Sequence, residues 1–284
     1  MTKKYSYLNG KVVLTEKAKI SIHDLGVMRG FGVFDSLRSY DGVPFLLDAH
    51  ISHFHESARL IGLKPPVGKD EIAGIIKNLV KKNGNPDAAV RMVLTGGESD
   101  DTVTYNIETP TFFVTVEKIQ TYPPEVYKKG VKIISVENER RIPNAKTTDY
   151  ILMFSLQKLK REKNAFEIIY FSRGRVLEGS TFNFFIFKGN KLITPRDGVF
   201  KGETRNFTLS FAREMFKVEE REALIRELKT ADEAFLTSTK REIMPVVKID
   251  SLKIGNGKVG ENTKRLMAVF RERVDEFVAR NRGL

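Results

Sequence analysis

Cysteine and tryptophan are both absent from this chain of 284 residues. Without cysteine, disulfides, thiolate metal sites and cysteine nucleophiles are excluded, and a reducing compartment is compatible with the composition. Only four histidines occur, at positions 23, 50, 53 and 55, and no carboxylate–histidine helix motif accompanies them. We therefore expect no metal centre. No signal-type core and no apolar run long enough to cross a bilayer is seen, so we expect a cytoplasmic protein with no membrane partner.

Basic residues, in contrast, are abundant. The chain carries 48 lysines and arginines against 36 aspartates and glutamates, a formal net charge of +12. Such an excess raises the question of a nucleic-acid partner. The cations are interleaved with acids and form no arginine-rich tail, so we expect no specific nucleic-acid binding and a basic surface that attracts anionic metabolites.

The first 119 residues are typical of a small α/β domain. Asn9–Gly10 and Asp41–Gly42 are hairpin signals, because both central positions of a type I′ turn need positive φ. Asp48 has the character of a helix N-cap, and the apolar spacing after it predicts a helix ending at Gly62. A second helix is expected at about 69–82, and strands at 88–95 and 111–116.

Residues 120–126 read as a linker, since Pro123–Pro124 cannot continue a helix interior or a central strand. We assign 127–284 to a larger second domain. Its predicted elements are a strand at 131–135, a helix at about 149–161 carrying Ile151, Phe154, Leu156 and Leu159, hairpins at Arg173–Gly174 and Gly189–Asn190, a strand at 234–237 and a final helix at about 260–280.

One lysine is placed where a lysine can do chemistry. Lys146 follows the Pro143–Asn144 turn signal and precedes the small polar residues Thr147 and Thr148. A lysine at such a junction can point into a cleft, where desolvation makes its amine nucleophilic. A lysine in a loop by chance is the ordinary alternative.

Three further features share a chemical theme. Glu178 stands where a strand emerges into a Gly–Ser–Thr turn, Glu203 and Thr204 open a helix after Gly202, and Ser238 and Thr239 follow a buried strand. Singly, the two hydroxyl-bearing turns are explained by helix capping or turn chemistry. Together with Lys146 they form the set that pyridoxal 5′-phosphate requires: an imine-forming amine, an acid for the pyridine nitrogen and donors for the phosphate.

Four motifs, in order along nearly the whole chain, resemble the fold-type IV pyridoxal-phosphate enzymes, the family of branched-chain aminotransferases, D-amino-acid aminotransferases and aminodeoxychorismate lyase. They are "AKTTDY" around Lys146, "EGSTFNFFIF" from Glu178, "GETR" from Gly202 and "TSTKREIMPV" from Thr237. The resemblance implies a two-domain α/β (α+β) fold, with a small N-terminal domain, a larger C-terminal domain with a β-barrel-like core, and a homodimer.

The resemblance also assigns roles to residues. Lys146 would form the imine with the cofactor and shuttle a proton, and Glu178 would pair with the pyridine nitrogen. The phosphate would be held by Glu203, Thr204, Ser238 and Thr239, and Tyr150 would lie near the cofactor hydroxyl.

His53 departs from the family pattern. An arginine in the pattern H-x-x-R-L usually grips the cofactor phosphate, and here the pattern reads His50–Ile51–Ser52–His53–Phe54. His53 would donate one hydrogen bond where arginine gives a charged fork. The expected result is weaker retention of the cofactor, for which Lys240 or Arg241 would compensate. The alternative is that His53 only packs on the helix surface.

Substrate choice depends on two arginines. Arg29 and Arg91 match positions at which a subgroup of D-amino-acid aminotransferases binds the substrate carboxylate, with Arg29 reaching in from the partner subunit. Arg91 also matches the L-branched-chain enzymes, so Arg29 alone favours D-amino acids, with a 2-oxo acid as the amino acceptor. The alternatives are an aminodeoxychorismate lyase that releases pyruvate, or a catalytically weakened or nucleic-acid-binding relative.

Overall fold

The computed structural model describes residues 3–283 and divides into two compact units. The first unit holds the described residues of Met1–Gln120, together with Ala145–Asp149 and Glu276–Leu284. The second unit holds Thr121–Asn144 and Tyr150–Asp275. Two segments that we assign from sequence to the C-terminal domain, the one that carries Lys146 and the end of the final helix, therefore group with the first unit.

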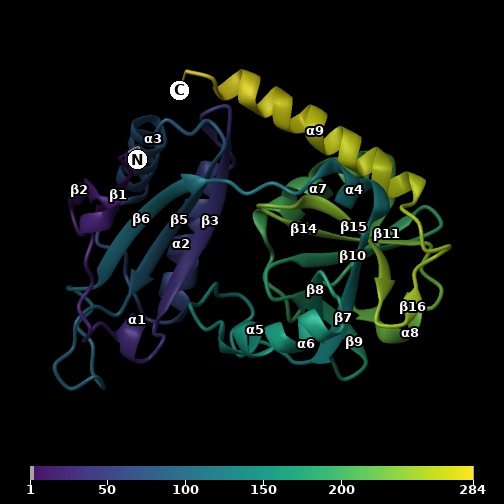
Figure 1. The fold of residues 1–284 in the computed structure, drawn as a ribbon, viewed down its shortest axis with the longest axis horizontal. Helices are drawn as coiled ribbons and strands as arrows, with labels where there is room; N and C mark the ends of the chain where they lie inside the picture. Colours follow the sequence, from purple (N-terminus) through teal and green to yellow (C-terminus); the bar gives the residue numbers. More distant parts are fainter. Residues whose placement is uncertain (1–2, 284) are drawn as a thin grey trace. The chain divides into compact units, whose positions relative to one another are not determined.

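A six-stranded antiparallel sheet forms the first unit, in the order β2-β1-β6-β5-β3-β4. Helices α2 and α3 pack against it, and Figure 1 shows α2 lying along β3 and β5. The core between them includes Leu37, Phe54, Ile76 and Phe112. The elements are β1 (Tyr5–Leu8), β2 (Lys11–Leu14), a 3-10 turn (Thr15–Lys17), α1 (Leu25–Met28), β3 (Gly32–Tyr40), β4 (Val43–Pro44), α2 (Leu47–Leu60), α3 (Lys69–Asn83), β5 (Ala88–Thr95) and β6 (Thr111–Lys118).

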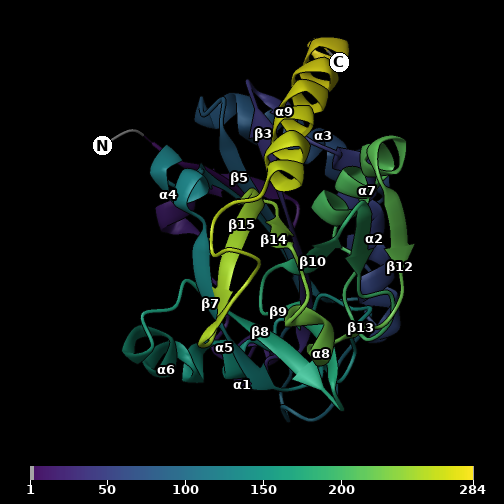
Figure 2. The same cartoon turned by 90° about the vertical axis from the view of Figure 1, so that its right-hand side faces the viewer.

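A curled ten-stranded sheet that forms a half-barrel dominates the second unit. Its order is β12-β11-β10-β14-β15-β7-β8-β9-β13, and β16 pairs with β15; Figure 2 shows β7, β15 and β14 side by side. Its elements are α4 (Pro124–Lys129), β7 (Val131–Glu137), α5 (Ile151–Ser155), α6 (Gln157–Glu162), β8 (Glu167–Ser172), β9 (Arg175–Gly179), β10 (Asn183–Lys188), β11 (Lys191–Thr194), α7 (Glu203–Met215), β12 (Lys217–Glu220), β13 (Ala223–Leu224), α8 (Ile225–Leu228), β14 (Glu233–Ser238), β15 (Glu242–Ile249), β16 (Leu252–Lys253) and the first part of α9 (Glu261–Asn281).

The predicted hairpins are confirmed. Asn9–Gly10, Asp41–Gly42 and Arg173–Gly174 all have positive φ at both positions and join paired antiparallel strands. This agreement follows from turn chemistry, which is local and therefore readable from the sequence.

Two helix predictions are corrected in part. Helical structure is confirmed over most of 149–161, but as two short helices, α5 and α6, that meet at Leu156, and Ile151 and Phe154 are 79% and 68% exposed instead of buried. Asp48 does not cap α2, because the helix begins one residue earlier and Leu46, with a left-handed φ of 52°, is the cap. Along residues 3–283, no helix combines the length and the apolar character needed to span a membrane.

Candidate active site

The segment Ala145–Asp149 places Lys146 beside β3 in the first unit. The Phe34 N–H donates to the Lys146 carbonyl at 2.9 Å, and the Thr148 N–H donates to the carbonyl of Gly32 at 2.9 Å. On the α2 side, the Lys146 N–H donates to Ser57 Oγ at 3.1 Å. These bonds hold the backbone of Lys146 against two elements, so the position of its side chain is set by the fold and not by a loose loop.

The cations of Lys146 and Arg91 both lie near the ring of Phe34. Lys146 Nζ is 5.4 Å from the ring centroid, and Arg91 Cζ is 5.5 Å from it. Both distances are within the range of attraction between a cation and an aromatic ring. The first unit therefore brings together the predicted nucleophile and one of the two predicted carboxylate-binding arginines.

Asp35 and His50 form a buried pair next to this group. The carboxylate is 1% exposed and the imidazole 5%, with Asp35 Oδ1 2.7 Å from His50 Nδ1. Burial acts to raise the pKa of the Asp35 carboxyl, but the nearby His50, Lys146 and His53 outweigh it, so this pKa lies below its usual range. Asp35 is therefore an ionised carboxylate in the interior.

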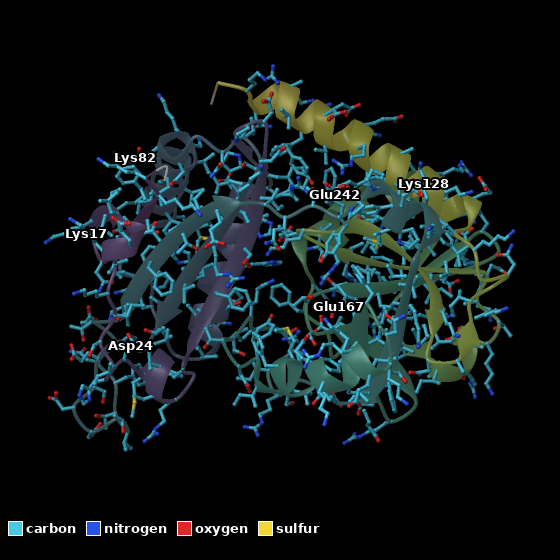
Figure 3. The ribbon with its side chains drawn as sticks, in the orientation of Figure 1. Lys17, Asp24, Lys82, Lys128, Glu167 and Glu242 are labelled. Atoms are coloured by element: carbon cyan, nitrogen blue, oxygen red, sulfur yellow. The ribbon has the colours of Figure 1, made fainter. Side chains whose placement is uncertain are left out.

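His53 lies half-buried on α2 and is one of the three basic residues that act on Asp35. Arg29 is exposed at the end of α1, where its guanidinium donates to the carbonyl of Thr102 at 3.1 Å and to Thr102 Oγ1 at 3.0 Å. The start of α1 is fixed by Asp24 (Figure 3), which accepts from the Gly26 N–H and from the hydroxyl of Thr95. The Arg29 guanidinium thus contacts the loop between β5 and β6.

In the second unit, Glu178 is a buried carboxylate near the end of β9. Its Oε1 is 2.7 Å from Arg140 Nε, an ion pair whose N–H does not align as a hydrogen bond. The guanidinium also donates to the carbonyls of Gly179 and Ser180 at 3.2 and 2.8 Å. Burial alone would lower the pKa of Arg140, but Glu178 and Tyr150 raise it above its ordinary value. Glu178 therefore has a permanent cationic partner.

Tyr150 lies close to the same arginine. Its ring centroid is 5.9 Å from Arg140 Cζ, and its hydroxyl is hydrogen-bonded to the guanidinium. Two of the residues predicted to contact the cofactor, Glu178 and Tyr150, are therefore joined through Arg140. The sequence analysis did not identify this arginine, because nothing local in "ENERRIPNAK" distinguishes Arg140 from Arg141.

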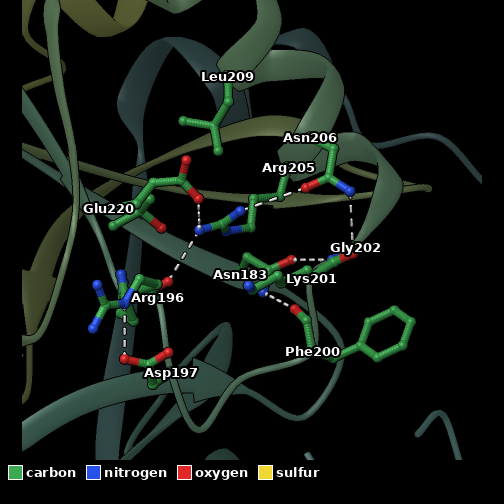
Figure 4. Close-up of polar contacts among 12 residues, drawn as sticks. Asn183, Arg196, Asp197, Phe200, Lys201, Gly202, Arg205, Asn206, Leu209 and Glu220 are labelled. Carbon is green, nitrogen blue, oxygen red and sulfur yellow. Dashed lines mark hydrogen bonds and ion pairs between the residues drawn. The ribbon is translucent and has the colours of Figure 1, made fainter. Parts of the chain in front are cut away.

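Asn183 connects Glu178 to the start of α7, and Figure 4 shows its contact with Gly202. Its Nδ2 is 3.4 Å from Glu178 Oε2, and its Oδ1 accepts the Gly202 N–H at 3.2 Å. Helix α7 begins after Gly202 with no side-chain cap on its first turn, where Glu203 and Thr204 lie. Such a helix start offers N–H groups to an anion. A side chain at position 202 would displace the Asn183 amide, because a Cβ there would lie 2.8 Å from Asn183 Oδ1.

The last residue of the "GETR" motif has a structural contact. Arg205 is 1% exposed and its Nη2 donates to Glu220 at 2.9 Å and to the carbonyl of Pro195 at 3.1 Å (Figure 4). Burial lowers the pKa of Arg205. The ion pair joins the first turn of α7 to β12 and so holds the helix start in place.

The Ser238–Thr239 turn follows β14 directly. Strand β14 pairs with β10 so that Thr237 is opposite Asn183, which brings this turn into the same part of the second unit as Glu178 and Gly202. Arg241 closes the turn: its N–H donates to Ser238 Oγ at 3.3 Å.

The guanidinium of Arg241 is held inside the second unit. It donates to Thr181 Oγ1 at 3.0 Å, pairs with Glu167 and lies against the rings of Tyr122 and Phe166. These contacts engage the Arg241 guanidinium in holding the Ser238–Thr239 turn. Arg241 therefore does not replace the arginine that is missing from the H-x-x-R-L pattern.

The chain was compared with known proteins. Residues 32–249 match the family model described as amino-transferase class IV. The chain belongs to the class IV aminotransferases. The members of this family use pyridoxal 5′-phosphate, and this is the cofactor of the chain.

Its relatives carry three different activities in their names. It is 34% identical to a Methanocaldococcus jannaschii protein named provisionally as a branched-chain-amino-acid aminotransferase, over 94% of this chain and 95% of that one. It is 29% identical to the D-alanine aminotransferase of Bacillus licheniformis (94% and 95% covered) and 29% identical to the aminodeoxychorismate lyase of Bacillus subtilis (98% and 97%).

The fold is that of the fold-type IV aminotransferases. A crystal structure of a T.th. branched-chain amino acid aminotransferase with pyridoxamine 5′-phosphate superposes with a TM-score of 0.86 at 26% identity, covering 96% of this chain and 95% of that one. The donor set of this aminotransferase suits the cofactor, since it contains a lysine amine, a buried carboxylate and an uncapped helix start.

Proposed function

We propose that this class IV aminotransferase transfers an amino group between a D-amino acid and a 2-oxo acid in two half-reactions, with branched-chain L-amino acids as the next candidate substrates. The observation that carries amino transfer is the placement of Lys146 and Arg91 at the ring of Phe34, whereas the preference for D-amino acids rests on Arg29. An amine that moves a proton at the α-carbon and a guanidinium that holds the α-carboxylate must lie near one another.

Bound pyridoxal phosphate supplies the electron sink that stabilises negative charge at the substrate α-carbon. Lys146 would anchor the cofactor and would move the proton of that carbon. Glu178, paired with Arg140, would accept a hydrogen bond from the protonated pyridine nitrogen. The N–H groups and hydroxyl of the Glu203–Thr204 helix start would hold the phosphate.

Further contacts complete the proposed cofactor site. Ser238 and Thr239 donate to the phosphate from their turn, and His53 contributes one donor from α2. Tyr150 lies near the cofactor hydroxyl. Because His53 offers a single donor in place of a fork, we expect the cofactor to dissociate more readily than from a relative with arginine at this position.

We also propose a cytoplasmic homodimer. The support for a dimer is an exposed apolar surface around α1 and the loop between β5 and β6, formed by Ile22, Val27, Met28 and Val103, which are 75%, 63%, 44% and 80% exposed. Large exposed patches of this kind mark protein interfaces. Arg29 lies in this surface, bonded to Thr102, so it is placed to reach a partner subunit. The lack of cysteine supports the reducing compartment.

A half-reaction screen tests the substrate class. The purified enzyme with pyridoxal phosphate is mixed with matched D- and L-amino acids, and the conversion of the cofactor is followed by its absorbance. We expect faster conversion by D-alanine and D-glutamate than by their L-enantiomers. Conversion by L-leucine or L-valine alone would overturn the preference for D-amino acids. Branched-chain L-amino acids would then be the substrates.

The role of Arg29 is tested by Arg29→Gln. We expect the KM for D-amino acids to rise by about tenfold or more, because a charge-assisted contact to the carboxylate contributes about 1.5–3 kcal/mol. The matched control is Arg59→Gln, an exposed arginine of the same unit whose partner is Glu56. Equal effects of the two substitutions would remove Arg29 from the substrate site.

The second candidate is a lyase, favoured by the relative named aminodeoxychorismate lyase. A lyase would release pyruvate from aminodeoxychorismate without a 2-oxo acid as co-substrate. Pyruvate release under these conditions, with no amino transfer between an amino acid and a 2-oxo acid, would replace the proposed function.

A further inference from the structure

Asp35 is a buried carboxylate with one oxygen still to be accounted for. Oδ1 is 2.7 Å from His50 Nδ1, while Oδ2 is buried and accepts no hydrogen bond in the described part of the chain. A buried anionic oxygen without a donor costs free energy comparable to a lost hydrogen bond or more. An acceptor of this kind points to a donor that reaches it in another state of the protein.

The segment that carries Lys146 runs beside β3 next to Asp35. The N–H of Phe34, the residue before Asp35, donates to the Lys146 carbonyl at 2.9 Å, so the lysine side chain starts at the edge of the strand and can extend toward either face. Lys146 is also one of the charges that stabilise the ionised form of Asp35. The ammonium of Lys146 is therefore the mobile cation best placed to approach the carboxylate.

His50 fixes the carboxylate for this purpose. It comes from the first half of α2, is 5% exposed and contacts the oxygen opposite to the one left open. With Oδ1 held by the imidazole, Oδ2 has a defined direction, so a lysine that swings toward it finds an acceptor already oriented.

We propose that Asp35, oriented by His50, is a positioning residue for Lys146: its Oδ2 receives the lysine ammonium in the cofactor-free protein and in the pyridoxamine form, when the amine is neither bonded to the cofactor nor taking the substrate proton. This rests on the proposed role of Lys146 as the cofactor-bonding lysine. Between half-reactions Asp35 keeps the side chain in one place and in its charged form, so that it returns to the cofactor from a fixed position.

The test measures the reactivity of the lysine amine itself. The full chain is treated briefly with acetic anhydride, once free of cofactor and once loaded with pyridoxamine 5′-phosphate, a form in which the lysine is not bonded to the cofactor. Acetylation of Lys146 is quantified by mass spectrometry relative to Lys158, an internal standard whose side chain is 82% exposed. Only the neutral amine reacts, so an ammonium held by Asp35 reacts slowly.

Asp35→Asn is expected to raise the relative acetylation of Lys146 by about fivefold or more in both forms. The reason is that an opposite charge within about 4–6 Å of an amine changes the ratio of its charged to its neutral form by about tenfold or more. The control is Asp48→Asn, which makes the same charge change at an exposed position of the same unit and should leave the ratio unchanged. An unchanged ratio in a folded Asp35→Asn protein would overturn the proposal, even if its melting temperature falls, because a purely structural pair would act on stability alone.

A second variant covers the case in which Asp35→Asn does not fold. His50→Asn keeps the carboxylate and removes the group that orients it, so a smaller rise at Lys146, about twofold, is expected; no rise would contradict the proposal. Failure of the proposed function is distinguishable, because the cofactor-free arm reports on the Asp35–Lys146 contact whether or not amino acids are transaminated.

Discussion

Two buried carboxylates, Asp35 and Glu178, define the chemistry at the scale of single residues. Asp35 is held by the imidazole of His50, and Glu178 by the guanidinium of Arg140. The partners differ in kind, because an imidazole can lose its charge near neutral pH while a guanidinium cannot. Glu178 thus lies beside a group that stays cationic at every working pH, an arrangement that suits the partner of a protonated pyridine nitrogen.

Arg140→Met is expected to destabilise the protein strongly. It leaves the buried Glu178 carboxylate without its cation, and breaking a buried pair in this way costs about 3–5 kcal/mol. We expect a fall in the free energy of unfolding by urea and faster loss of the cofactor on dialysis. The control is Arg141→Met at the exposed neighbouring position, expected to change stability by less than about 0.5 kcal/mol. If the two variants behave alike, the ion pair contributes nothing measurable.

At the scale of elements, the carboxylate of Glu227 holds α8 in place. Glu227 accepts two bonds from the guanidinium of Arg221, at 2.7 and 2.9 Å, and one from the Leu224 N–H at 2.9 Å. These bonds, those of Arg221 first, lower the pKa of Glu227 to about 2. The contact joins α8 to the strand connection before it.

The depressed pKa predicts how acid acts on stability. A carboxyl whose folded-state pKa is lowered stabilises the fold above its ordinary pKa, and this contribution disappears as the pH falls toward about 2. Glu227→Gln should therefore lower the melting temperature at pH 7 by a few degrees, which corresponds to a loss of about 1 kcal/mol in the free energy of unfolding. At pH 3 the same substitution should lower the melting temperature less. Glu222→Gln, with 57% of its side chain exposed, is the control. A loss at pH 3 as large as at pH 7 would contradict the assignment.

The helices, strands and turns differ in how well they could be predicted from the sequence. Turn residues such as Asn9–Gly10 could be predicted because their conformational demand is local. The apolar spacing at 149–161 predicted one continuous helix with a buried face. The burial was predicted incorrectly, because Ile151 and Phe154 are exposed to solvent. Strand β15 was overlooked because its residues were read as part of a binding motif.

The candidate site shows the same limit. Lys146, Glu178 and the Gly202 helix start stand in motifs and could be found from the sequence, and the structure joins the last two through Asn183. Arg140, the partner of Glu178, could not be found, since an ion pair between distant positions leaves no local pattern; His50 stands in a motif, but its pairing with Asp35 does not. Asp35 did leave a signal: in a strand of period two it shares the buried side with Val33 and Leu37, and a buried acid requires a partner.

At the scale of the whole molecule, each unit carries part of the chemistry. The first holds Lys146 and Arg91, and the second holds Glu178 and the phosphate-type turns. The exposed surface around α1 adds a third requirement, because Arg29 would serve the site of a partner subunit. An active enzyme is therefore expected to be dimeric.

Charges placed in this surface test that expectation. Val27→Glu with Val103→Glu is expected to produce monomers in sedimentation velocity and to reduce the amino-transfer rate at least tenfold, because buried unpaired carboxylates oppose association. Val12→Glu, on β2 and 41% exposed, is the matched control and should remain dimeric. Dimers of the double variant with full activity would exclude this surface as the interface.

The central claim is that Lys146 bonds the cofactor, and reduction with borohydride tests it most directly. The protein is loaded with pyridoxal phosphate, reduced and digested, and the peptides are searched for the mass of a phosphopyridoxyl group. We expect the phosphopyridoxyl group on Lys146 and no such group in Lys146→Ala treated in the same way. A modification on another lysine, or one that persists in Lys146→Ala, would contradict it.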